Sequence, residues 1–76
     1  MKSDRIVLKE LRYEYREIIN KIDRLREFRY TFDEYMQLGS EMCSLLDIQL
    51  RIMESYSEVL LARMILLRKK VYDEED

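Results

Sequence analysis

Residues that break helices are almost absent from this chain. Its 76 residues include one glycine and no proline. Tight β-hairpins depend on glycine-containing turns, and phosphate-binding loops depend on several glycines, so we exclude both. An α-helix needs neither residue in its interior. The sequence therefore predicts an all-α protein.

The chain is also short for a stable monomer. A chain of this length buries only about 60% of the surface that its unfolded form exposes, so its core is small. We expect one domain over residues 1–76, with a stability that depends on contacts between copies.

Capping residues predict where the helices begin and end. Apolar residues at alternating three- and four-residue steps predict a first helix over residues 3–30. Thr31 stands three residues before Glu34, the spacing of a capping box, so we expect a short helix over residues 32–38. Gly39 followed by Ser40 is typical of a helix end and a new N-cap, which begins a long helix over residues 40–72. Residues 73–76 are all acidic and are expected to form a frayed, solvated tail.

The long helix carries two apolar stripes, whereas the first helix carries one. The stripe of the first helix consists of Leu8, Leu11, Tyr15, Ile18, Ile22 and Leu25. One stripe of the long helix consists of Met42, Leu46, Met53, Tyr56, Leu60 and Leu67, and the other of Leu45, Ile48, Ile52, Val59, Ala62 and Leu66. In an antiparallel helical hairpin the first helix covers only one of the two. We therefore expect such hairpins to assemble into an oligomeric helical bundle.

The residue types available exclude most enzyme chemistry. There is no histidine, and Cys43 is the only cysteine. A Ser-His-Asp triad, a Cys-His pair, a metal site with histidine ligands, a CxxC zinc site and an intrachain disulfide are therefore excluded. A helical mutase of the chorismate type could work with arginines alone, but its arrangement is not recognisable here. We expect no enzymatic activity, no metal and no cofactor.

Charge and hydropathy also limit the partners. The sequence pI is about 5.2, which disfavours sequence-independent binding of long nucleic acids. No stretch approaches the ~18 apolar residues of a membrane span, and the N-terminus lacks the apolar core of a signal peptide. The sequence therefore predicts a soluble protein of the cytoplasm that binds no membrane.

Cations gather at one predicted end of the hairpin. Arg5, Lys9, Arg12 and Arg16 share one face of the first helix, and an antiparallel arrangement brings Arg63, Arg68, Lys69 and Lys70 beside them. Tyr13 and Tyr72 lie at the same end. Arginine forks pair with phosphate oxygens, so one interpretation is a phosphate site. The other is a solvated face that exchanges salt bridges with nearby acids.

A polar line interrupts the apolar surface of the long helix. Gln49, Tyr56 and Arg63 are separated by steps of seven, so they share one face. Polar residues at such positions commonly set the register of a helical assembly. Alternatively, they form a ligand pocket in which Tyr56 stacks on a base, Gln49 binds its edge and Arg63 holds a phosphate.

The same residues carry a resemblance to a known group of proteins. The residues concerned are Leu45, Leu46, Gln49, Met53, Tyr56, Leu60 and Arg63, preceded by Arg24, Leu25, Phe28 and Phe32. This pattern resembles small bacteriophage-encoded helical-hairpin accessory proteins. The resemblance implies a phage protein that acts stoichiometrically in the bacterial cytoplasm against host immunity, in one of two ways. It would sequester an anionic nucleotide signal such as a cyclic oligonucleotide, or it would bind a protein, as an inhibitor of a host defence protein or as a phage assembly adaptor.

Overall fold

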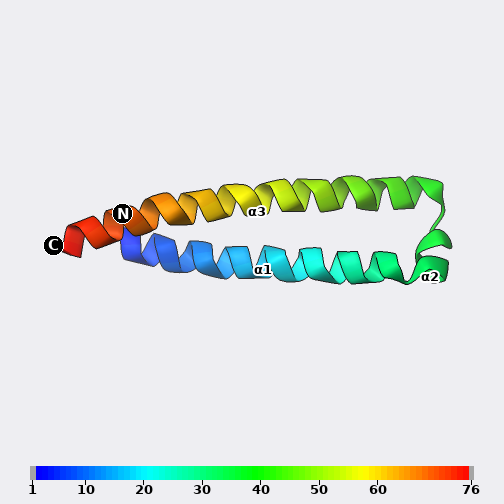
Figure 1. Ribbon diagram of the computed structural model, residues 1–76, viewed down its shortest axis with the longest axis horizontal. Helices are drawn as coiled ribbons and strands as arrows, with labels where there is room; N and C mark the ends of the chain where they lie inside the picture. The colour runs from blue at the N-terminus through cyan, green and yellow to red at the C-terminus, as the bar shows by residue number, and fades with distance from the viewer. Residues whose placement is uncertain (1, 76) are drawn as a thin grey trace.

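Three helices account for nearly all of the residues that the structure describes. The computed structural model describes residues 2–75 and contains α1 (Asp4–Tyr30), α2 (Phe32–Met36) and α3 (Ser40–Glu75). The predicted all-α class is confirmed. Figure 1 shows α1 and α3 side by side in opposite directions, with α2 at the turn and with the start of α1 and the end of α3 at the far pole. The result is a rod of 56 × 19 × 16 Å.

The ends of the helices follow the predicted capping residues with two corrections. The Thr31 side chain makes no capping bond to α2, because its hydroxyl donates backward to the Phe28 carbonyl at the end of α1. The predicted capping box is therefore wrong, and α2 ends at Met36 rather than at residue 38. Gly39 has φ +90°, a left-handed conformation that glycine adopts without strain, and it separates α2 from α3.

The acidic end of the chain continues the long helix. We expected α3 to end at residue 72, but it extends to Glu75, because no glycine or proline follows Gly39 to stop it. The predicted frayed tail is therefore wrong for residues 73–75. Asp76 lies outside the described residues.

The core is a single seam between α1 and α3. On α1 it uses the predicted stripe, of which Leu8, Leu11 and Ile22 are buried. On α3 the seam follows a heptad pattern made of Leu46, Leu50, Met53, Ser57, Leu60, Met64, Leu67 and Val71. Met42 and Tyr56, which we assigned to this stripe, are exposed instead, because a strict three-four alternation places positions 50, 57, 64 and 71 toward α1.

The second apolar stripe of α3 faces away from α1. Its large side chains are between 50% and 67% exposed. They are Leu45, Ile48, Ile52, Val59 and Leu66. We call these five residues, together with exposed Ala62, the uncovered stripe. As predicted, α1 covers only one of the two apolar stripes of α3 and leaves the other exposed to solvent.

Within residues 2–75, none of the described helices is apolar enough over a sufficient length to span a membrane.

Candidate anion-binding site

The free ends of α1 and α3 enclose a basic hollow of about 450 Å³. Its lining residues are Arg5, Leu8, Lys9, Arg12, Arg68, Val71 and Tyr72. The three α1 cations are spaced by four and three residues, so they follow one another along a single face of that helix. Arg68 joins them from α3, because the antiparallel arrangement places the last turns of α3 beside the first turns of α1. The structure thus assembles four of the predicted site residues.

The basic hollow combines positive charge with a partly apolar floor. Leu8 and Val71 are buried beneath the cations. The guanidinium carbon of Arg68 lies 5.4 Å from the centre of the Tyr72 ring, a cation–π contact that orients both side chains. Glu10, the acid next to Lys9 in sequence, is paired with Lys2 at 2.8 Å. The hollow can therefore accept phosphate oxygens on its cations and a flat apolar group on its floor.

Three of the remaining predicted cations line another hollow at the same pole. Arg63, Lys69 and Lys70 line a second hollow of about 590 Å³, together with Val7, Leu11, Leu66, Leu67 and Asp73. Arg63 and Arg68 are five residues apart, which is about 140° around a helix, so they point to different sides. Arg12 and Arg63 were expected to lie beside each other, but they line different hollows. Arg16 and Tyr13 are exposed and line neither of these two hollows.

Of the polar line of α3, Arg63 lines the second hollow, whereas Gln49 and Tyr56 line neither hollow at this pole. The Tyr56 hydroxyl donates a hydrogen bond to the Glu14 carboxylate of α1. This hydrogen bond and partial burial raise the pKa of Tyr56, while the nearby charge of Arg63 lowers it. Gln49, Tyr56 and Arg63 are all exposed in the single chain. The Tyr56 hydroxyl thus has a partner on α1, but the contact is open to solvent, because Tyr56 lies at the edge of the seam rather than inside it.

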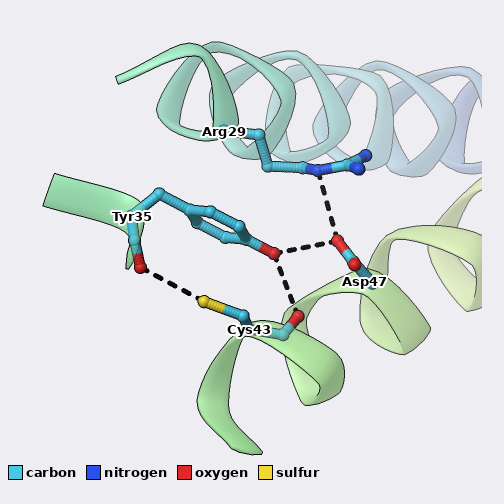
Figure 2. Close-up of polar contacts among 4 residues, drawn as sticks. All are labelled: Arg29, Tyr35, Cys43 and Asp47. Atoms are coloured by element: carbon cyan, nitrogen blue, oxygen red, sulfur yellow. Dashed lines mark hydrogen bonds and ion pairs between the residues drawn. The ribbon is translucent and has the colours of Figure 1, made fainter. Parts of the chain in front are cut away.

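A polar cluster at the turn was not predicted from the sequence. Figure 2 shows the Tyr35 hydroxyl between the Cys43 carbonyl, at 3.0 Å, and the Asp47 carboxylate, at 2.9 Å. Asp47 also accepts an ion pair from Arg29 at 3.2 Å, and the Cys43 thiol lies 3.2 Å from the Tyr35 carbonyl. The ring of Tyr35 packs edge-on against Phe28, with centroids 5.9 Å apart. The cluster joins all three helices, and no local sequence pattern indicates it, because its members come from three separate helices.

The cluster gives a pH-dependent prediction. Burial of Tyr35, with its hydrogen bond to Asp47, raises the pKa of this tyrosine above the ordinary 10.0. A raised pKa in the folded state stabilises the protein below pH 10, and this stabilisation is lost as the pH rises through the folded pKa. We expect Tyr35→Phe to lower the melting temperature at pH 7 and to reduce the further drop between pH 9 and 11. Thermal denaturation followed by circular dichroism measures both. An unchanged alkaline slope would contradict this assignment.

A third hollow, lined partly by aromatic side chains, lies at the turn and has fewer cations than the basic hollow. It measures about 440 Å³ and is lined by Arg26, Arg29, Tyr30, Phe32, Tyr35 and Met36. Both arginines are engaged by acids of α3, Arg26 by Glu54 at 3.3 Å and Arg29 by Asp47. The basic hollow at the free pole is lined by four cations rather than two, so it is the better anion site.

Comparison with known proteins identifies a family. No curated protein matches the chain, and no solved structure does. The sequence profile of one family, Sequestin, matches residues 6–66. The match covers most of α1, all of α2 and α3 as far as the uncovered stripe extends. It also includes Lys9 and Arg12 of the basic hollow and the whole polar line. Because the match spans well over half of the chain, the chain belongs to the Sequestin family.

Proposed function

We propose that this protein sequesters an anionic nucleotide signal, such as a cyclic oligonucleotide, in the basic hollow. One observation carries the proposal: four cations from two helices surround a floor that is apolar and bears an aromatic ring. A cyclic oligonucleotide presents phosphodiesters to such cations and flat bases to such a floor. The family name, Sequestin, points to capture rather than to turnover.

The proposal extends to where and how the protein acts. A binder without catalytic machinery works stoichiometrically, so it has to accumulate to the concentration of the signal that it removes. A phage accessory protein in the cytoplasm of an infected bacterium fits this requirement. It would keep an immune signal from the host effector that the signal activates.

Self-association is part of the same proposal. We propose that the antiparallel pair of α1 and α3 is a hairpin unit of an oligomeric helical bundle. The support is the uncovered stripe, whose five large apolar side chains are at least half exposed along most of α3. Continuous apolar surface of this kind is rare on monomers and marks interaction sites.

The same stripe favours a second candidate function. In this alternative the stripe binds a host defence protein as an inhibitor, or another phage protein as an assembly adaptor. A protein bound there would be held by apolar contacts, so its affinity would change little with salt.

Thermal denaturation with a ligand panel tests the proposal against the alternative. We expect cyclic di- and trinucleotides to raise the melting temperature, because a ligand that binds only the folded state stabilises it by mass action. At 100 times Kd the gain is about 2.7 kcal/mol in the free energy of unfolding. The shift should shrink as the salt concentration rises, since charged contacts are screened.

Linear nucleotides and inorganic phosphate serve as controls in the same assay. They share the charge but not the ring of phosphodiesters, and we expect smaller shifts from them. If no nucleotide at millimolar concentration changes the melting temperature, the proposal fails and the protein-binding alternative takes its place.

A further inference from the structure

We infer that the uncovered stripe binds the same stripe of a second copy, with the two α3 helices antiparallel and a two-fold axis at the level of residue 57. This inference rests on the self-association in the proposed function. It adds the face, the direction and the register of the contact. It also assigns a role to the polar line of Gln49, Tyr56 and Arg63, which the basic hollow does not use.

The spacing along α3 fits an antiparallel register. With Ser55 and Lys69, the stripe positions are 45, 48, 52, 55, 59, 62, 66 and 69. Their steps alternate between three and four residues and are the same when read in either direction, so they fit an antiparallel pair as well as a parallel one. In antiparallel coiled-coil packing, a position that precedes a three-residue step meets one that follows such a step. Ile48 then packs against Leu66 of the partner subunit, and Ile52 against Ala62 of the partner subunit.

The second hollow fits this arrangement. It is lined largely by apolar side chains, among them Val7, Leu11, Leu66 and Leu67. In the proposed register, Leu45 of the partner subunit lies at the level of residue 69, beside this hollow. Leu45 is 61% exposed in the single chain and has no other cover. A leucine entering a hole formed by two neighbouring helices is the contact that stabilises helical bundles.

Charge along α3 also favours the antiparallel direction. Residues 63–70 contain four cations and no acid. In the antiparallel register this run lies at the levels of residues 44–51 of the partner subunit, which contain one acid and one cation and so carry no net charge. A parallel pair would place each cationic run against its own copy, which is repulsive.

The polar line then lies along the edge of the contact, where it packs beside the polar line of the second copy running in the opposite direction. Tyr56 approaches Tyr56 of the partner subunit near the axis, and Gln49 lies opposite Arg63 of the partner subunit. Glu14 accepts the Tyr56 hydroxyl and so supports this edge from α1. Covering by the second copy would remove these exposed side chains from bulk water, so the line would set the register of the pair.

Single-cysteine variants test the direction of the pair. In a Cys43→Ser background we would prepare Ile48→Cys and Leu66→Cys, two exposed positions whose replacement leaves the seam intact. Positions 48 of the two copies would be about 27 Å apart along the axis, so neither variant alone should form a disulfide dimer. The two variants, refolded together, should form one through positions 48 and 66. In a parallel pair, position 48 would face position 48 and position 66 would face position 66. Each variant alone would then form a disulfide dimer, and this result would overturn the inference.

Sedimentation separates failure of this inference from failure of self-association. If the unmodified chain sediments as an oligomer but the mixed cysteines never cross-link, the proposed register is wrong and self-association stands. If it sediments as a monomer at micromolar concentration, both fail, while nucleotide binding in the basic hollow stays testable. We expect Ile52→Asp to give a helical monomer by sedimentation and circular dichroism, and an unchanged oligomer would also overturn the inference.

Discussion

Replacing Arg12 and Arg68 together with glutamine should weaken binding of a cyclic oligonucleotide by at least about 100-fold. The two side chains approach the basic hollow from α1 and α3. Each charge-assisted hydrogen bond to a phosphate contributes on the order of 1.5–3 kcal/mol, and 1.4 kcal/mol corresponds to a tenfold change in Kd. Isothermal titration calorimetry on the double variant measures the loss. Glutamine keeps the length and polarity of the side chain, so the helices should remain intact.

Arg63→Gln and Arg51→Gln are matched controls for this experiment. Arg63 lines the second hollow, and Arg51 is an exposed arginine of α3 that lines neither hollow at this pole. We expect each control to change the affinity by no more than about threefold, the range of an exposed charge. If Arg63→Gln weakens binding as much as the double variant, the ligand spans both hollows, and the basic hollow is not the whole site.

Leu60→Ala should be the most damaging single truncation in the seam. Leu60 has no exposed surface and lies midway along α3, against α1. Loss of a fully buried leucine side chain costs about 2–5 kcal/mol, because the transfer free energy of the removed atoms and the cavity both count against the folded state. That loss is a large share of the stability of a domain of this size. Urea denaturation followed by helical ellipticity measures it.

Leu61→Ala is the control at the next position in the chain. Leu61 is 42% exposed, so truncation there removes less buried surface, and we expect a loss under about 1.5 kcal/mol. Equal losses at the two positions would mean that α3 is rotated about its axis relative to the seam described here.

The all-α class, the first stripe and the start of α3 could be predicted because they depend on local signals. One glycine, no proline and a regular three-four alternation leave a helix as the only regular structure for most of the chain. α1 has a single apolar stripe and is otherwise polar, so the sequence alone indicates which face of α1 is buried. The ends of α2 and α3 were less predictable, because a capping residue such as Thr31 can bond to the helix before it as well as the one after it.

The packing of α3 against α1 determines which side of α3 faces α1. Both stripes are apolar, and the sequence placed Met42 and Tyr56 in the seam, whereas the structure uses Leu50, Ser57, Met64 and Val71. A long helix that is apolar on two sides has several rotations of similar local free energy. The choice among them depends on how its side chains interdigitate with those of α1, and no local pattern contains that information.

A gathering of cations from both ends of the chain at one pole could be predicted from the sequence, because antiparallel helices bring their free ends together. That Arg12 and Arg68 share a hollow while Arg63 faces another could not, because it depends on how α3 is rotated against α1. Each residue turns a helix by about 100°, so a few positions along the chain move a side chain from one side of the rod to the other. The rotation that packs the seam therefore also chooses which arginines can hold one anion.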